Sequence, residues 1–191
     1  GGAGMIYLLR HGLDDEDYIG GHSDVDVIDE GIEQVKRSSE FIKSLDIDRV
    51  ITSDVKRAVG SARIVKDSLK GEISFEVDSR LRELDKGLLT GKLRSSLTKE
   101  EEEICNMTDI NQKYPEGESM QDMYDRVKYL IDSGYFSDKN SSLIVTHRGI
   151  INMMYFMFND EPLTMNKKKF GVSHASVHEL DIEKRKIKRI F

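Results

Sequence analysis

The sequence predicts an α/β protein of three layers, in which a mostly parallel central sheet carries helices on both faces. Two observations support this prediction. Short apolar runs typical of buried strands alternate with longer segments whose apolar residues recur at helical spacing. Strands that alternate with helices in this way pair in parallel, because each helix returns the chain to the same end of the sheet. The chain has 191 residues, a length that favours one domain, which we place at residues 5–191.

The expected strands are four or more residues long and are either continuously apolar or alternating. Four of them are expected to form the main part of the sheet, and the last two are expected to form an antiparallel pair joined by a charged turn. These six segments are residues 5–9, 49–52, 73–77, 142–146, 176–182 and 186–190.

The expected helices carry an apolar stripe that faces the sheet, as Val55, Ala58, Ala62 and Val65 do in the second helix. Asp29 is expected to cap the first helix, because a side-chain oxygen at that position accepts from free backbone N–H groups. The five predicted helices are residues 29–45, 55–69, 95–105, 119–131 and 149–158.

Two segments stand apart from this alternation. Residues 78–117 are the least regular part of the chain, and we expect them to form an insertion over an active site. Residues 1–4 consist of glycine and alanine before Met5 and resemble a remnant of cloning, so they are left out of the fold prediction.

Composition and charge exclude several classes of protein. The formal net charge of −6 disfavours nonspecific binding to nucleic acid or to membrane surfaces. No apolar run approaches the ~20 residues that span a bilayer. The single cysteine, Cys105, excludes an internal disulfide and a site built from several thiolates. We therefore expect a cytoplasmic protein, in which a small pocket can still be locally positive and bind an anionic substrate.

Polar side chains follow three of the predicted strands. Arg10 and His11 end the first strand, Ser53 follows the second with Arg57 one turn later, and His147 follows the fourth. Because ligands of such sheets bind beyond the carboxyl ends of the strands, we expect these side chains to converge on one site.

These residue types suit phosphate chemistry. A guanidinium group binds phosphate oxygens with two parallel hydrogen bonds and keeps its charge at any relevant pH. A neutral imidazole can attack phosphorus and divide one difficult displacement into two easier ones. A second imidazole can donate to the phosphoryl oxygens. The alcohol that leaves also needs a proton donor, and Glu83 is the candidate.

Several blocks of the chain resemble, in order, the motifs of the histidine phosphatase superfamily, the phosphoglycerate-mutase-like proteins. The matching residues are Leu8-Leu9-Arg10-His11-Gly12, Gly21-His22-Ser23-Asp24, Thr52-Ser53 with Arg57-Ala58, Leu81-Arg82-Glu83, Pro115-Glu116-Gly117-Glu118-Ser119 with Arg126, Val145-Thr146-His147 and Ala175-Ser176. The resemblance implies that His11 is the phosphorylated nucleophile, that Glu83 donates and accepts the proton, and that Arg10, Arg57 and His147 form the phosphate pocket.

The chain departs from the family pattern at two places. Leu13, Asp14 and Asp17 stand where the family usually has an acid or amide, a hydroxyl residue and an asparagine. A carboxylate beside a phosphate dianion is unfavourable, so this loop either binds a positive group of the substrate or points away. Arg148 replaces a small residue and suits a substrate with several negative charges. Asp17, Arg148 and Gly21 are therefore candidate substrate contacts.

The sequence thus predicts a phosphomonoesterase that uses neither a metal nor a cofactor and acts on a small phosphorylated metabolite or a phosphoprotein. His174 and His178 lie near or on a strand, without the helical spacing of a metal site. Two alternatives stay open. One is a cofactor-dependent phosphoglycerate mutase, although members of that class are generally longer. The other is a phosphate-binding module without catalytic activity.

Overall fold

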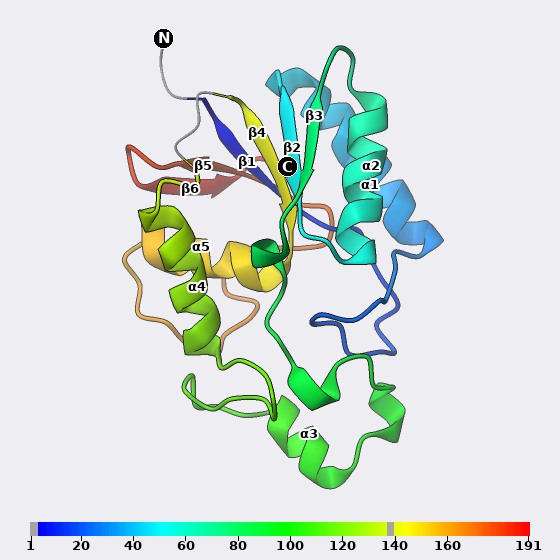
Figure 1. Cartoon of the computed structure of the whole chain (residues 1–191), viewed down its shortest axis with the longest axis vertical. Coiled ribbons are helices and arrows are strands. Elements are labelled where there is room, and N and C mark those ends of the chain that lie inside the picture. Colours follow the sequence, from blue (N-terminus) through cyan, green and yellow to red (C-terminus); the bar gives the residue numbers. More distant parts are fainter. Residues whose placement is uncertain (1–3, 137–139) are drawn as a thin grey trace.

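The computed structural model describes residues 4–136 and 140–191, and its centre is a mixed sheet of six strands within these residues (Figure 1). The strand order is β3-β2-β4-β1-β5-β6. The first four strands in this order run parallel, and β5 and β6 are antiparallel to their neighbours. The strands are β1 (Ile6–Arg10), β2 (Arg49–Thr52), β3 (Ser74–Val77), β4 (Ser142–Thr146), β5 (Val177–Asp181) and β6 (Lys186–Arg189). The predicted fold class is confirmed.

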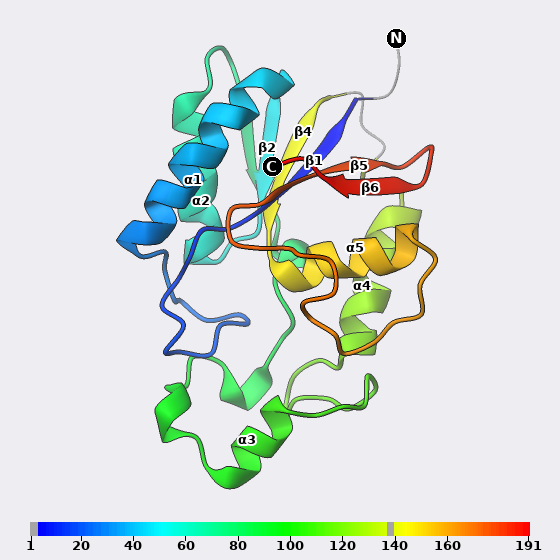
Figure 2. The same ribbon diagram turned by 180° about the vertical axis from the view of Figure 1, so that it is seen from behind.

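Helices cover both faces of the sheet, as the two opposite views show (Figures 1 and 2). The helices α1 and α2 pack together on one face, and α4 and α5 pack together on the other. The short helix α3 lies away from the sheet (Figure 1). The helices are α1 (Asp29–Ile42), α2 (Lys56–Ser68), α3 (Lys99–Cys105), α4 (Met120–Asp132) and α5 (Arg148–Phe158).

Alternation along the strands creates two apolar cores. In β1, Leu8 faces the core beneath α4 and α5, whereas Leu9 faces the core beneath α1 and α2. Both side chains are fully buried. Successive side chains of a strand point to opposite faces, so a strand covered on both sides reads as a continuous apolar run. The two cores hold the carboxyl ends of β1, β2 and β4 in register at one edge.

Two helix starts differ from the prediction. Asp29 is not the cap of α1; it is the first residue of that helix, and Ile28 occupies the cap position without a side-chain hydrogen bond. The helix expected at 95–105 begins only at Lys99. Thr98 accepts from the N–H of Glu101, whose side chain accepts from the N–H of Thr98 in return, and this reciprocal cap fixes the start.

Residues 78–117 lie beyond the carboxyl ends of the parallel strands (Figures 1 and 2). They contain three short 3-10 turns and α3. Backbone hydrogen bonds join them to the loop after β1: Ile19 N–H donates to Lys92 O at 2.9 Å, and Arg94 N–H donates to Asp17 O at 2.8 Å. This pairing places the segment beside the end of β1. Among the described residues, none of the helices has the length and apolar character needed to cross a bilayer.

Candidate active site

The carboxyl ends of the strands open into a cleft of about 150 Å³. Six of the residues singled out in the sequence line it together: Arg10, His11, Gly21, Arg57, Glu83 and Arg148. His147 contacts the His11 ring without itself lining the cleft, and Asp17 is exposed outside the cleft. Further side chains complete the lining, namely Asp14, Glu16, Tyr18, Lys86, Arg94 and His174. Positively charged groups therefore dominate the cleft of a protein whose net charge is negative.

His11 is a neutral imidazole with one nitrogen free. Its ring is 4% exposed, and Nδ1–H donates to the carbonyl oxygen of Gly12 at 2.8 Å. Burial and the positive charges of Arg57 and Arg10 lower the pKa of His11 to about 3. Because Nδ1 holds the proton, the lone pair is on Nε2, which is the atom that a nucleophilic imidazole uses.

Two arginines are fixed in the cleft by backbone carbonyl groups. Arg57 is 2% exposed, and its guanidinium donates to Gly21 O at 2.6 Å and to Ser23 O at 3.2 Å. Arg10 donates to Val172 O at 2.8 Å. Burial lowers the pKa of Arg10 to about 10, which still leaves the group charged at neutral pH. Gly21 adopts a positive φ of 58°, a conformation that glycine reaches without strain, and so turns its carbonyl group toward Arg57.

His147 is fully buried and packs edge-on against His11, with 5.1 Å between the ring centroids. Its Nε2 lies 2.7 Å from the hydroxyl oxygen of Ser53. Its Nδ1 is buried without a hydrogen-bond partner in the described part of the chain. If the hydroxyl group donates to Nε2, the ring proton is on Nδ1 and is available to a ligand oxygen. Burial lowers the pKa of His147 well below its ordinary value, so the ring is neutral.

Glu83 extends toward the start of α5. One carboxylate oxygen accepts from the N–H of Leu84 at 2.9 Å, and the other accepts from the N–H of Gly149 at 3.1 Å. Burial by itself would raise the pKa of Glu83, but the two N–H donors and the nearby Lys86 ammonium lower it overall. Gly149 has no room for a side chain, because a methyl group there would collide with the Glu83 carboxylate. The carboxylate is thus ionised and fixed when the cleft is empty.

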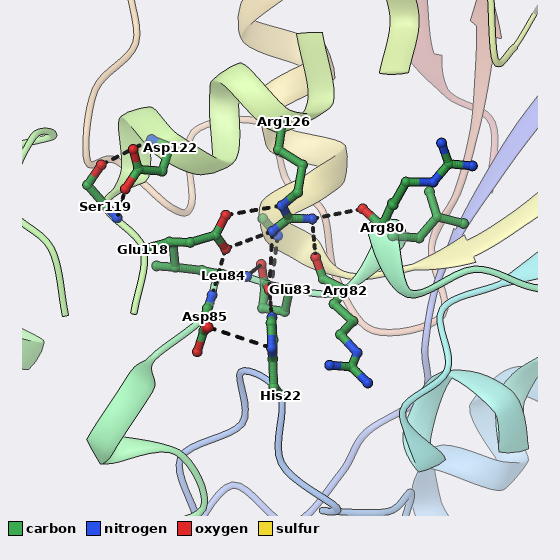
Figure 3. A network of polar contacts seen from close by, with 12 residues as sticks. His22, Arg80, Arg82, Glu83, Leu84, Asp85, Glu118, Ser119, Asp122 and Arg126 are labelled. Carbon is green, nitrogen blue, oxygen red and sulfur yellow. Dashed lines mark hydrogen bonds and ion pairs between the residues drawn. The ribbon is translucent and has the colours of Figure 1, made fainter. Parts of the chain in front are cut away.

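A network of polar contacts holds the backbone on either side of Glu83 (Figure 3). The guanidinium of Arg126, on α4, donates to the carbonyl groups of Arg80 and Arg82, each at 2.8 Å. Two further donors of Arg126 bind both carboxylate oxygens of Glu118, at 2.9 and 3.1 Å. The third carbonyl of this segment, that of Glu83, lies 3.4 Å from Arg126 Nη2. Arg126 therefore holds three backbone carbonyl groups within residues 80–83, the segment that carries the carboxylate.

His22 supports the same backbone from the opposite side. Its Nε2–H donates to Glu83 O at 2.9 Å, and its Nδ1 lies 3.9 Å from a carboxylate oxygen of Asp85 (Figure 3). Asp85 is in turn held by Glu118, which accepts from the Asp85 N–H at 2.9 Å. Because His22 and Arg126 hold the Glu83 carbonyl group from opposite sides, the backbone from which the Glu83 side chain extends is fixed.

Asp14 and His174 belong to the cleft, although the sequence analysis did not assign them to it. Arg10 Nη2 donates to His174 Nε2 at 3.0 Å. The Asp14 carboxylate lies 3.7 Å from the same nitrogen and 3.8 Å from Arg57 Nε. Burial by itself would raise the pKa of Asp14, but contact with His174 and the charge of Arg57 lower it to about 2. A negative charge of the protein itself therefore lies in the cleft between Arg57 and His174.

The position of His174 could have been inferred from the sequence. A strand that pairs antiparallel with a strand of the parallel set starts at the edge of the sheet where the parallel strands end. His174 directly precedes the predicted antiparallel pair, so it is placed at that edge. Lys86 and Arg94 come from the irregular segment 78–117, for which the sequence offers no comparable signal. The described residues contain no cluster of three or more His, Cys, Asp or Glu side chains that could hold a metal ion.

The structure is that of an α/β protein with a cleft in which cationic side chains surround a neutral imidazole. Residues 6–190 match the family model of the histidine phosphatase superfamily, branch 1. The chain belongs to this family. It is 36% identical over 153 residues to a probable phosphoglycerate mutase, GpmB, of Salmonella choleraesuis, an alignment that covers 76% of this chain and 70% of the relative.

Solved structures of similar fold lie at lower sequence identity. YhfR of Bacillus stearothermophilus superimposes with a TM-score of 0.78 at 24% identity, covering 94% of this chain and 92% of that protein. A mycobacterial glucosyl-3-phosphoglycerate phosphatase superimposes with a TM-score of 0.75 at 21% identity, covering 98% of this chain and 97% of the other. These likenesses show that the fold is shared.

Proposed function

We propose that the protein hydrolyses small phosphomonoesters through a phosphohistidine on His11. The observation that carries this proposal is the state of the His11 ring, which donates from Nδ1 to Gly12 O and so leaves an unprotonated Nε2 at the cleft. Arg10, Arg57 and Glu83 line the same cleft, so nucleophile, positive charge and proton carrier share one site.

In the first step, Nε2 of His11 attacks phosphorus and the bond from phosphorus to the alcohol oxygen breaks. Glu83, protonated in the substrate complex, gives its proton to that oxygen. The bound phosphoryl group raises the pKa of the neighbouring carboxylate, because two negative charges in one cleft repel each other. A phosphomonoester whose second pKa is about 6 can itself bring the proton as a monoanion.

In the second step, water attacks phosphorus on the side opposite His11. Glu83 takes one proton from the water, the bond from phosphorus to Nε2 breaks, and inorganic phosphate leaves. Arg10 and Arg57 bind the phosphoryl oxygens through both steps, and His147 donates from Nδ1. The two guanidinium groups supply the positive charge that a metal ion would otherwise provide, so we expect activity in the presence of a chelator.

The phosphoenzyme tests this proposal directly. Rapid quench of the protein with a ³²P-labelled aryl phosphate in EDTA should trap one acid-labile, base-stable phosphoryl group per chain, on the peptide that contains His11. A protein that binds phosphate but never becomes labelled would be a binding module and not an enzyme of this kind.

A mutase is the second candidate, and the name of the curated relative favours it. A mutase returns the phosphoryl group of phosphohistidine to a second hydroxyl group of the substrate, whereas a phosphatase passes it to water. Incubation with 3-phosphoglycerate, with and without 2,3-bisphosphoglycerate, separates the two. We expect release of inorganic phosphate with no dependence on the bisphosphate; isomerisation that requires the bisphosphate would instead identify a mutase.

Replacing Arg126 by methionine should lower kcat by about 10- to 100-fold, while sulfate binds with nearly unchanged affinity. The variant loses the donors that hold the carbonyl groups of Arg80, Arg82 and Glu83, so the carboxylate loses its alignment. Steady-state kinetics and calorimetric titration with sulfate measure the two effects. Lys128→Met is the matched control, because Lys128 lies on the same helix in an exposed ion pair with Asp132. Equal kinetics of Arg126→Met and the wild type would exclude the positioning role.

A further inference from the structure

A second pocket adjoins the catalytic cleft. It encloses about 40 Å³ between the Glu83 loop, the start of α5 and the loop that carries Lys167. Glu83, Lys86 and Arg148 line both the pocket and the cleft, so the two spaces share one wall. An alcohol that leaves from a phosphoryl group at His11, with its oxygen at Glu83, would therefore extend into this pocket.

Three cationic side chains line the pocket: Lys86, Arg148 and Lys167. Within residues 4–136 and 140–191, no ion pair or side-chain hydrogen bond links any of the three to an acidic partner. Burial, followed by the charge of Lys167, lowers the pKa of Lys86 to about 8. Burial and the charge of Arg148 also lower the pKa of Lys167. Among the residues that the structure describes, Glu83 is the one carboxylate that lines the pocket, and its charge acts on the pKa of both lysines in the opposite direction. Three cationic groups facing one carboxylate leave the pocket with a net positive charge, which favours a negatively charged ligand.

The remaining walls limit the size and polarity of that ligand. Met120, Met123, Met153 and Phe156 form an apolar surface. Asn152 also lines the pocket, and its buried Oδ1 has no hydrogen-bond partner in the described residues. A volume of about 40 Å³ corresponds to about three water-sized positions. The pocket therefore suits a short chain that ends in a compact anionic group.

We propose that Lys86, Arg148 and Lys167 form a subsite for a second anionic group, so that the preferred substrate is the phosphomonoester of a small alcohol that carries this group. The inference rests on the proposed function, because the phosphoryl group at His11 and the leaving oxygen at Glu83 set the direction of the alcohol. Lys167 lines the pocket but not the catalytic cleft, so a substitution of Lys167 tests the subsite without changing the catalytic cleft.

The test compares three phosphomonoesters of similar length: propyl phosphate, phosphoglycolate and ethylene glycol bisphosphate. The first has an uncharged end, the second ends in a carboxylate and the third in a phosphate. We expect the wild type to favour at least one charged compound over propyl phosphate by about 10- to 100-fold in kcat/KM, the usual effect of a hydrogen bond between charged groups. The compound that shows the preference identifies the anionic group.

Lys167→Met should reduce this preference by about tenfold. Lys168→Met is the matched control. Lys168 is the next residue, is exposed, and does not line the pocket, so the kcat/KM values for all three compounds should stay at the wild-type level. Equal kcat/KM values for all three compounds in the wild type, or an unchanged preference in Lys167→Met, would overturn the subsite.

The outcome can be separated from that of the proposed function. Turnover of propyl phosphate without any preference for the charged compounds rejects the subsite and leaves the phosphatase standing. If no compound is turned over, calorimetric titration with the same three compounds still tests the subsite. Tighter binding of a charged compound, lost in Lys167→Met, supports the subsite, and equal dissociation constants reject it.

Discussion

His11→Asn is expected to lower kcat/KM for an aryl phosphate by about 10⁴-fold or more, the loss typical of a removed nucleophile. Asparagine keeps a polar side chain of similar reach but has no lone pair on a ring nitrogen. The backbone carbonyl of Gly12, which accepts from Nδ1 at 2.8 Å, fixes the one tautomer in which Nε2 can attack. No other imidazole replaces it, because His147 is fully buried with its Nε2 bonded to Ser53, and His174 accepts from Arg10.

The anion site itself should survive this substitution. Arg10 and Arg57 are held by the carbonyl groups of Val172, Gly21 and Ser23, none of which depends on the imidazole. Calorimetric titration with sulfate should therefore give a dissociation constant within a few-fold of the wild type. Loss of turnover together with retained sulfate binding identifies His11 as the reacting group. Activity close to the wild type in His11→Asn would reject the phosphohistidine.

The fold could be predicted from the sequence because each strand and helix is marked by the pattern of apolar and capping residues within its own segment. Each central strand is buried on both faces, so Leu8 and Leu9 are both apolar, and the strand reads as one continuous run. Ser119 was expected to begin a helix, and it caps α4 through its hydroxyl group and Asp122. The start of α3 was placed too early, since Thr98 and Glu101 outweigh the general helical composition of the residues before them.

The site was predictable only where it follows strands of known direction. Arg10 ends β1 and His11 follows it, and Arg57 is the second residue of the helix after β2, so their convergence follows from a parallel sheet. Lys86 and Lys167 lie in long loops. The sequence of such a loop has no hydrophobic periodicity from which its path could be predicted. The sequence left open whether the acidic loop after Gly12 binds a positive group of the substrate or points away. In the structure Asp14 lines the cleft and Asp17 lies outside it, so the two acidic residues of this loop differ in position.

Asp14→Asn should bind sulfate about 10- to 100-fold more tightly than the wild type at pH 7. The Asp14 carboxylate lies 3.8 Å from Arg57 Nε and occupies space in which this guanidinium would bind an anion. A sulfate bound by the same guanidinium would lie beside this carboxylate. The repulsion between two unit charges about 4 Å apart, ~4 kcal/mol at an effective dielectric constant of 20, is larger than the ~1.4 to ~2.7 kcal/mol that a 10- to 100-fold change in affinity requires. Asparagine has the same shape and no charge, so it removes this repulsion without opening a cavity. Asp17→Asn changes the same charge in the same loop outside the cleft, and should leave the affinity within about twofold.

The pH dependence of binding distinguishes this explanation from a simple change of net charge. In the empty cleft the pKa of Asp14 is about 2. A bound dianion raises that pKa, so the complex holds more protons than the free protein, and sulfate affinity in the wild type must rise as pH falls. Sulfate keeps its two charges over this range, so the protein alone supplies the change. Glu83 also faces the cleft and contributes some proton uptake, which the variant retains.

Calorimetry in buffers of different ionisation enthalpy should therefore show fewer protons taken up by Asp14→Asn than by the wild type at pH 5. Equal uptake in the two proteins would mean that Asp14 stays charged beside the bound anion and that another group carries the proton.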